Sequence, residues 1–255
     1  NLKTAEIQCL SGTGITEADF PNLTYINRAF ESTPVKTASL PKLTDLNGAF
    51  RGCTLLESVY IPNVYKIGEY AFGGCVSLPQ DMDFSKITEV GSNGFAEAPF
   101  EIIDLPNCTK LWGCAFKDAF SKTINLPMCK TLGGGDFTGE YIETVNIENA
   151  ESIESIIDAE FINAFSLKNI YAPKLKQVPA FDFDDVGLQQ IKNGKKPVIE
   201  FIYAPSATKF NYERSNFKAC DKLDFLFAPN LESISGYFYF PENDNFTLYL
   251  SDSLK

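Results

Sequence analysis

Residues 56–75 read LESVYIPNVYKIGEYAFGGC, and most of the chain repeats variations of this stretch. Val59 and Ile61 are separated by one residue, which predicts a short strand with both side chains on the same face. Pro62 ends that strand, because proline cannot donate a hydrogen bond to a sheet ladder. Phe72 follows one short segment later and is predicted to lie on the opposite wall of a small folded unit.

The stretch recurs along the chain at steps of 20 to 32 residues. The position of Pro62 is taken in successive copies by Pro21, Pro41, Pro62, Ser85, Pro106, Pro127, Glu148, Pro173, Pro205 and Pro229. The phenylalanines that follow are Phe30, Phe50, Phe72, Phe95, Phe116, Phe137, Phe161, Phe181 and Phe217. Self-similarity at this period is typical of a solenoid, in which each unit buries its apolar face against its neighbours. We therefore expect these phenylalanines to form a buried stack.

The unit resembles the BspA-type leucine-rich repeat, L-x-x-[IV]-x-[IL]-P-x-x-[LV]-x-x-I-x-x-x-A-F-x-x-C. The matching positions are Leu56, Val59, Ile61, Pro62, Ile67, Ala71, Phe72 and Cys75. The resemblance extends from about residue 15 to 251, with degenerate copies at Ser85 and Glu148. It implies an α/β solenoid, a right-handed leucine-rich-repeat superhelix of about ten coils. Its short parallel strands are expected to form one long sheet, with turns or short helical segments on the opposite wall.

The domain organisation follows from where the repeat begins and where it is interrupted. Residues 1–14 do not match the unit and are predicted to be an N-terminal cap, with the tail of an upstream domain as the alternative. Residues 15–255 are predicted to be a single solenoid domain. The coil between Pro173 and Pro205 is about ten residues too long. Because Asn193-Gly194 favours a tight turn, we expect a hairpin insertion near 182–200, with strands near 188–192 and 197–202.

The tip of the predicted hairpin is basic on an otherwise acidic chain. It carries Lys192, Lys195 and Lys196. These lysines are either a solvated loop tip or an electrostatic contact for a partner.

Composition excludes several classes of partner. The 255 residues carry a formal charge of −11, with an isoelectric point near 4.6. Nucleic-acid-binding proteins need basic patches, and anionic membrane surfaces repel an acidic protein. No apolar run approaches the ~18–20 residues of a membrane span. We therefore predict no nucleic-acid partner and no membrane insertion by this chain, which begins at Asn1 and is expected to be a mature or trimmed form.

The residue inventory argues against catalysis. The chain contains no histidine, which removes the histidine-dependent nucleophilic systems and the common zinc enzymes. No cofactor and no metal is predicted. The alternative is a carbohydrate-active solenoid enzyme, because Asp83 and Asp104 fall at equivalent positions of neighbouring coils. Carboxylates stacked about 5 Å apart would suit a retaining glycosidase.

The seven cysteines follow the repeat rather than a disulfide framework. Five sit at two repeat positions: Cys53, Cys75 and Cys220 after the phenylalanine, and Cys108 and Cys129 after the proline. Equivalent positions in adjacent coils are about 4.8 Å apart. We expect buried thiols that pack as small apolar groups, with disulfides between coils as the alternative.

The outward strand positions give the candidate binding site. The residues two before each proline position are small or polar in most early coils and aromatic in the last four, at Tyr171, Tyr203, Phe227 and Tyr249. Phe201 and Phe225 lie two residues further back and also point outward. An exposed aromatic strip is typical of protein or sugar recognition. The alternative is a strip covered by the hairpin or by a partner chain.

The resemblance implies a non-catalytic binding module of an exported protein at the bacterial cell surface or in the periplasm, with a role in adhesion or host interaction. The partner would be a host or matrix protein or a glycan. A third interpretation is a structural spacer that holds another domain away from the cell.

Overall fold

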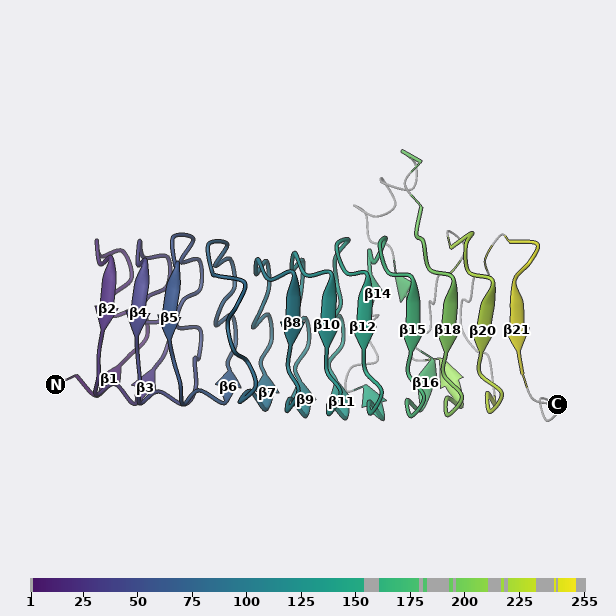
Figure 1. The fold of residues 1–255 in the computed structure, drawn as a ribbon, viewed down its shortest axis with the longest axis horizontal. Helices are drawn as coiled ribbons and strands as arrows, with labels where there is room; N and C mark the ends of the chain where they lie inside the picture. The colour runs from purple at the N-terminus through teal and green to yellow at the C-terminus, as the bar shows by residue number, and fades with distance from the viewer. Residues whose placement is uncertain are drawn as a thin grey trace.

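The structure, a computed structural model, describes residues 2–153, 161–178, 181–182, 193–194, 196–210, 217, 220–232, 241 and 243–250. The chain winds into coils stacked along one axis, with the N-terminal and C-terminal coils at opposite ends (Figure 1). All paired strands among the described residues are parallel, and each pairs with the equivalent strand of the next coil. None of the described residues belongs to a helix that is long and apolar enough to cross a membrane.

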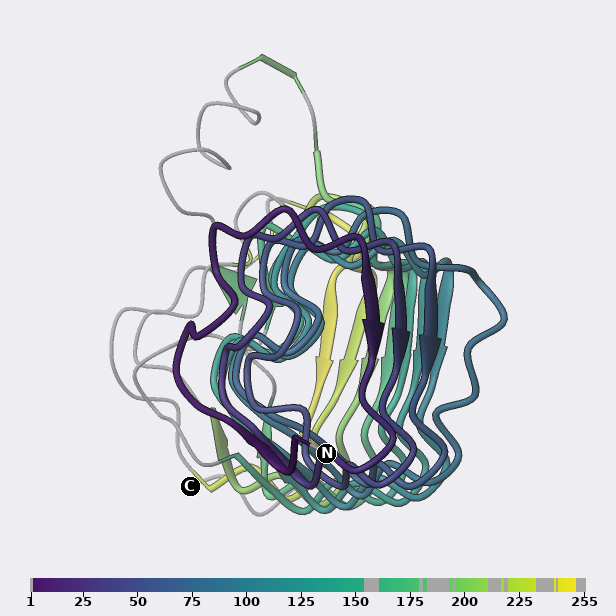
Figure 2. The same cartoon turned by 90° about the vertical axis from the view of Figure 1, so that its left-hand side faces the viewer.

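The strands that precede the proline position form the front row of the solenoid. They lie along one side of the coils when the stack is viewed end-on (Figure 2). Three of them form one sheet: β2 (Glu17–Asp19), β4 (Thr37–Ser39) and β5 (Ser58–Tyr60). The other seven form a second: β8 (Ile102–Asp104), β10 (Thr123–Asn125), β12 (Thr144–Asn146), β15 (Asn169–Tyr171), β18 (Phe201–Tyr203), β20 (Phe225–Phe227) and β21 (Thr247–Tyr249).

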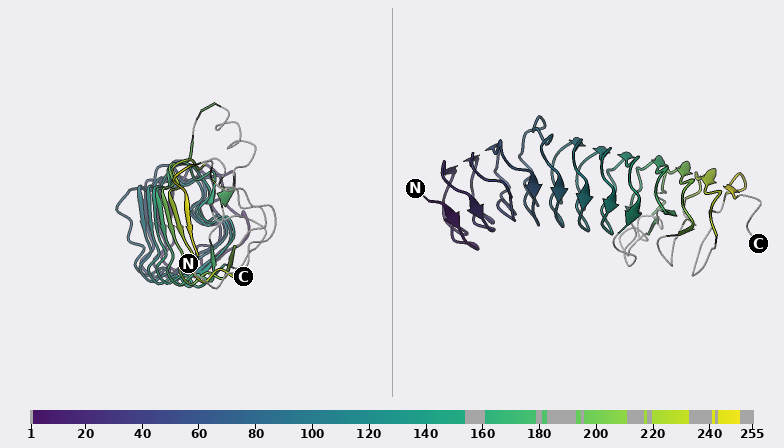
Figure 3. Two further views of the ribbon diagram at one scale, coloured as in Figure 1. Left: turned by 90° about the vertical axis from the view of Figure 1, so that its right-hand side faces the viewer. Right: turned by 90° about the horizontal axis from the view of Figure 1, so that it is seen from below.

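A second row of two-residue strands lies four residues after the proline position, visible from below in the right-hand view of Figure 3. Its five-stranded sheet contains β6 (Lys66–Ile67), β7 (Glu89–Val90), β9 (Lys110–Leu111), β11 (Thr131–Leu132) and β13 (Ser152–Ile153). Two pairs extend the row: β1 (Thr4–Ala5) with β3 (Tyr25–Ile26), and β16 (Gln177–Val178) with β19 (Lys209–Phe210). A further pair joins β14 (Phe161–Ile162) to β17 (Phe181–Asp182). The repeat did not reveal this row, because two residues are too few to show an alternating pattern.

The wall opposite the front row carries the Ala-Phe pairs of the repeat, such as Ala71-Phe72, and consists of turns, as in residues 47–52 and 69–74. The alternative of short helical segments is not found in the described residues, none of which is helical.

The predicted single long sheet is interrupted in the fourth coil. β5 pairs only with β4, and β8 pairs only with β10, because residues 81–84 between them form no strand. The coil bulges beyond the front row at this point (Figure 2). The step from Pro62 to Ser85 is 23 residues, against 21 in the next three coils, so two extra residues must be accommodated outside the ladder.

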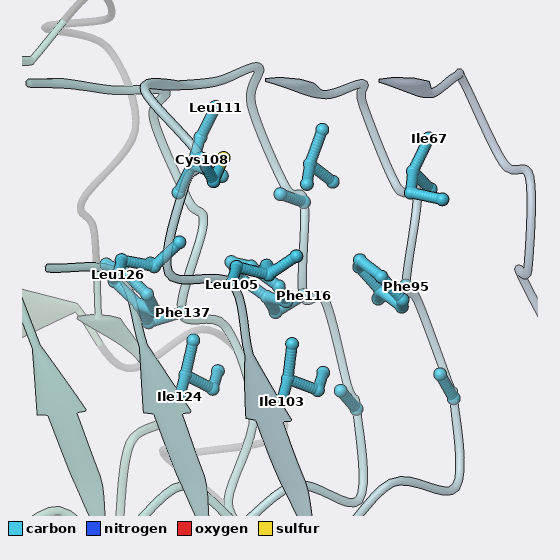
Figure 4. Packing of buried hydrophobic residues seen from close by; sticks show 14 of the residues in the cluster. Ile67, Phe95, Ile103, Leu105, Cys108, Leu111, Phe116, Ile124, Leu126 and Phe137 are labelled. Carbon is cyan, nitrogen blue, oxygen red and sulfur yellow. The ribbon is translucent and has the colours of Figure 1, made fainter. Parts of the chain in front are cut away.

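The core is the predicted phenylalanine stack. Six successive ring pairs from Phe30 to Phe161 have centroids 5.2 to 6.2 Å apart and interplanar angles of 6° to 31°. Figure 4 shows Phe95, Phe116 and Phe137 in line behind the inward residues of the front row, such as Ile103 and Ile124. Phe217 is also buried, which extends the aromatic core to the later coils.

The inward residues of the front row are buried as predicted, except at the two ends of the stack, where Phe20, Leu248 and Leu250 are partly buried, and near the interruption. Val59, Ile61 and Met82 are only partly buried, because the sheet has no continuous partner there.

The predicted buried thiols are confirmed. Cys53, Cys75, Cys108, Cys129 and Cys220 are buried and not disulfide-bonded. The alternative of disulfides between coils is therefore wrong for these five cysteines.

The two ends of the chain join the stack. β1 pairs with β3, and the amide of Leu10 donates to the carbonyl oxygen of Ala29 at 3.1 Å, so the predicted cap lies against the first full coil. At the other end β21 pairs with β20, so Thr247–Tyr249 continue the front row.

The hairpin insertion stays a prediction, because residues 183–192 and 195 lie outside the described residues. Gly194 has a φ of +88°, as a tight turn requires, and residues 193–194 project from the stack (Figure 1). The first predicted strand, 188–192, lies outside the described residues. The second is wrong over 197–200, since β18 begins at Phe201. The amide of Val198 donates to Phe165 of the preceding coil at 3.2 Å, and Ile199 is buried, so this segment joins the solenoid.

Candidate binding site

The predicted aromatic residues line up across four neighbouring front strands. The strand register places Tyr171 beside Tyr203, Tyr203 beside Phe227 and Phe227 beside Tyr249. Their ring centroids are 5.1, 5.3 and 4.8 Å apart, with interplanar angles of 8°, 10° and 14°. These spacings are close to the distance between paired strands, so the sheet itself sets the stacking. We call these four residues, with Phe201 and Phe225, the aromatic ladder.

Phe201 and Phe225 form a second, shorter column beside the first. Their centroids are 5.6 Å apart with an interplanar angle of 8°. Each also packs against the ring two residues later on its own strand, at 6.1 Å for Phe201 with Tyr203 and 6.2 Å for Phe225 with Phe227. The six rings therefore form one continuous aromatic surface over β15, β18, β20 and β21.

The ladder is accessible in this structure of a single chain. Tyr171 and Tyr249, at its two ends, are 50% and 49% exposed. The inner rings are partly buried, because each lies between two neighbours. The surface thus presents ring edges along its length.

The same sheet face becomes polar toward the N-terminus. Asp104, Asn125 and Asn146 occupy the equivalent outward positions on β8, β10 and β12. Tyr171 pairs directly with Asn146, so the boundary between polar and aromatic surface lies between β12 and β15.

The predicted basic tip is described only at Lys196. Its ammonium group lies 2.6 Å from a carboxylate oxygen of Asp221, and its side chain is 59% exposed. Lys192 and Lys195 lie outside the described residues. The structure therefore gives Lys196 an acidic partner within the chain and does not bring it into the aromatic ladder.

The carboxylate pair of the enzyme alternative is not formed on a ladder. Asp104 lies on β8, but Asp83 lies in the interrupted coil and pairs with no strand. An Asp83 oxygen accepts a hydrogen bond from the amide of Ser85 at 2.8 Å, and hydrogen bonds from the side chain and then the backbone of Ser85 lower the pKa of this carboxyl. The expectation that the two carboxylates are neighbours on one sheet was wrong, because the two extra residues displace this segment.

A row of charged residues on the second row of strands was not predicted from the sequence. Asp45, Lys66, Glu89 and Lys110 follow one another in successive coils, and Trp112 lies two residues after the last of them. The repeat spacing alone could have shown this row, since each residue lies four positions after its proline position.

Comparisons with known proteins agree with this architecture. The family model for the BspA type leucine rich repeat region matches six copies, over residues 46–155 and 88–202. A leucine-rich repeat protein from Bacteroides ovatus has a similar structure at 15% identity, with a TM-score of 0.53 over 94% of this chain and 72% of that one. A leucine rich cell surface protein from Faecalibacterium prausnitzii is similar at 18% identity, with a TM-score of 0.50 over 99% of this chain and 70% of that one.

No curated protein matches the sequence. The family match nevertheless covers more than half of the chain, and the described coils carry the repeat's strand, its turn wall and its buried phenylalanine. The chain therefore belongs to the family of BspA-type leucine-rich-repeat proteins.

Proposed function

We propose that the chain is a non-catalytic module that binds another protein through the aromatic ladder, as part of an exported bacterial surface protein with a role in adhesion or host interaction. The observation that carries this proposal is the stacking of the rings on one another. Tyr203 and Phe227 each have ladder rings on both faces. What they offer to a partner is therefore their edges and, for Tyr203, a hydroxyl group.

Ring edges favour a protein over a sugar as the partner. The polarised C–H groups of a sugar are attracted to the negative face of an aromatic ring and not to its positive edge. In the column of Tyr171, Tyr203, Phe227 and Tyr249, only the first and the last residue have a ring face without a neighbour from the ladder. Apolar side chains of a protein can pack on the edges, while tyrosine hydroxyls form hydrogen bonds at the rim, and tyrosine is enriched at protein interfaces for this reason.

A location at the cell surface or in the periplasm is supported by the family. The F. prausnitzii relative is described as a cell surface protein. A repeat fold also suits recognition, because outward positions can change while the buried stack is kept.

The test is a binding screen of this chain against immobilised host matrix proteins, followed by a variant with Tyr171→Ala, Tyr203→Ala, Phe227→Ala and Tyr249→Ala. We expect the variant to keep the circular dichroism spectrum of the wild type and to lose binding by at least about 30-fold, since each hot-spot ring contributes on the order of 2 kcal/mol. The matched control carries Asp104→Ala, Asn125→Ala and Asn146→Ala on the polar part of the same face. It should bind like the wild type.

Binding that survives in the folded aromatic variant would contradict the ladder as the site. If no matrix protein binds, the spacer interpretation is favoured.

A further inference from the structure

A hollow of about 350 Å³ opens on the second row of strands, on β6, β7 and β9 at the lower side of the stack in Figure 1. Its lining includes Asp45, Lys66, Glu89 and Trp112, which come from four successive coils. This volume is within the range of small-molecule sites. The hollow is separate from the aromatic ladder, which lies on the front row over β15 to β21.

The charged side chains of the hollow hold one another in place. The Lys66 ammonium group lies 3.3 Å from a Glu89 oxygen and 3.9 Å from an Asp45 oxygen. Strand pairing places these residues side by side, in the order Asp45, Lys66, Glu89. Their positions are therefore set by the sheet before any ligand arrives.

Trp112 forms one end of the hollow and is also fixed. Its indole nitrogen donates a hydrogen bond to Glu89 at 2.6 Å, and the Lys110 ammonium group lies 3.8 Å from the ring centroid. The side chain remains 41% exposed. A rigid, accessible aromatic side chain beside fixed polar groups lowers the ordering cost of binding.

The floor of the hollow has no side chains, because Gly68 and Gly91 form it. A Cβ at Gly68 would lie 2.7 Å from the Cα of Asn47, and a Cβ at Gly91 would lie 2.8 Å from the backbone of Gly68. Glycine is thus required by the close stacking of coils. The consequence is an open floor on which a flat ligand can approach the backbone.

Several polar groups in the hollow are available to a ligand. Oδ1 of Asp45 is buried, but the side chain as a whole is 41% exposed, so the second carboxylate oxygen, Oδ2, can accept a hydrogen bond from a ligand. Burial raises the pKa of this carboxyl, an effect that Lys66 partly offsets. The amide of Asn47 and the hydroxyl of Ser92 also line the hollow, so donors and acceptors occur together.

This set of groups selects a ligand class. The lining contains three carboxylates, Asp45, Glu69 and Glu89, and one lysine, Lys66, while Glu69 is paired with Arg28 at 3.4 Å. The lining is therefore net acidic, which disfavours phosphate and other anions. The mixture of donors and acceptors disfavours an apolar ligand, because its polar groups would be buried without partners. A carbohydrate fits both features, since its hydroxyls donate and accept hydrogen bonds and its C–H groups pack on an indole.

We propose that this hollow binds one sugar residue of a glycan, with its ring against Trp112 and its hydroxyls on Asp45, Asn47 and Ser92.

The chain offers a direct readout, because Trp112 is its single tryptophan. The intact protein is titrated with the methyl glycosides of glucose, galactose, mannose, fucose, N-acetylglucosamine and N-acetylgalactosamine while the tryptophan emission is recorded. We expect a saturable change with at least one glycoside, at millimolar concentrations. Asp45→Ala should weaken binding of that glycoside at least about tenfold, because it removes the exposed carboxylate oxygen of the hollow. Glu57→Gln changes an exposed carboxylate outside the hollow and should leave the affinity for the glycoside unchanged.

The quadruple alanine variant of the aromatic ladder is titrated in parallel and should respond like the wild type, so that failure of this proposal and failure of the proposed protein-binding function are distinguishable. The proposal is overturned if no glycoside gives a saturable change, or if Asp45→Ala titrates like the wild type. A saturable response to the methyl esters of lysine or arginine in place of any glycoside would also overturn it, since the ligand would then be a cation.

Discussion

At the scale of single residues, the buried cysteines take part in the hydrogen bonding between coils. The thiol of Cys53 donates to the carbonyl oxygen of Phe30 at 2.9 Å, and that of Cys75 to Phe50 at 3.0 Å. Each bond connects a coil to the one before it, at the residue that carries the buried ring. A small apolar group with one weak donor suits this position better than alanine, which would leave the carbonyl without that donor.

The burial of the cysteines predicts which thiols react in the native protein. The thiolate is the form that reacts, and burial raises the pKa of Cys53, Cys75 and Cys220. The hydrogen bond between Cys108 and Cys129 lowers the pKa of Cys108 and raises that of Cys129, but both residues are fully buried, so a reagent in water does not reach them. Cys9 is exposed and Cys114 is partly buried. With Ellman's reagent at pH 8, the native protein should therefore show one fast thiol and one slower thiol, with the remaining five appearing only on unfolding. Cys9→Ser should remove the fast phase, and more than two reactive thiols in the native state would contradict the buried assignment.

At the scale of elements, the interrupted coil shows how a ladder is completed without a strand. In regular coils, the residue before the front strand donates to the preceding coil, as the Glu57 amide does to Lys36 at 2.8 Å. At the interruption, the Glu101 amide donates to the side-chain oxygen of Gln80 at 2.7 Å. The side-chain nitrogen of Gln80 donates to the carbonyl oxygen of Pro99 at 2.7 Å. One side-chain amide thus replaces a backbone peptide group.

Replacing Gln80 should loosen the fifth coil locally. Gln80→Ala removes the partner of the Glu101 amide, and we expect about 1 kcal/mol of lost stability, because water can solvate both freed groups. Hydrogen exchange of the Glu101 amide should become faster, while exchange in β10 and β12 stays unchanged. Gln80→Glu keeps an acceptor and should preserve most of this protection. Equal protection in the wild type and in Gln80→Ala would show that the bond is not formed in solution.

The sequence was informative about the regular elements and uninformative about the irregular ones. Alternation of inward apolar and outward residues around Val59 or Ile124 predicts a front strand, and a proline marks its end. Most of the front row was therefore predicted from the sequence. The step before Ser85 is 23 residues against 21 on either side, but the spacing does not show where the two extra residues leave the ladder. The aromatic ladder was predictable because strand residues two apart share a face. The hollow at Trp112 was not, because it depends on glycines that face neighbouring backbone.

At the scale of the whole molecule, the two front sheets stop on either side of the interrupted coil, and the aromatic core continues across it. Phe84 lies in the interrupted coil and is 5% exposed. Its ring centroid lies 6.4 Å from that of Phe72 on one side, and 5.1 Å from those of both Phe95 and Phe100 on the other. In a solenoid, stability is a sum of coil and interface contributions, so cooperative unfolding requires strong interfaces throughout. Phe84 supplies an interface contact where the front row has no ladder.

Removing this ring should therefore separate the unfolding of the two parts. Phe84→Ala is expected to cost about 3–5 kcal/mol, and to turn one urea transition into two, because the fourth coil loses the ring that packs on Phe72, Phe95 and Phe100 where the front row has no ladder. Phe137→Ala removes a ring of the same size beside an unbroken front sheet, and should shift a single transition to lower urea. Circular dichroism would record the transitions, and hydrogen exchange would assign the less stable part, with β4 and β10 as reporters on either side. A single transition for Phe84→Ala, shifted like that of Phe137→Ala, would mean that the second row of strands is enough to keep the solenoid cooperative across the interruption.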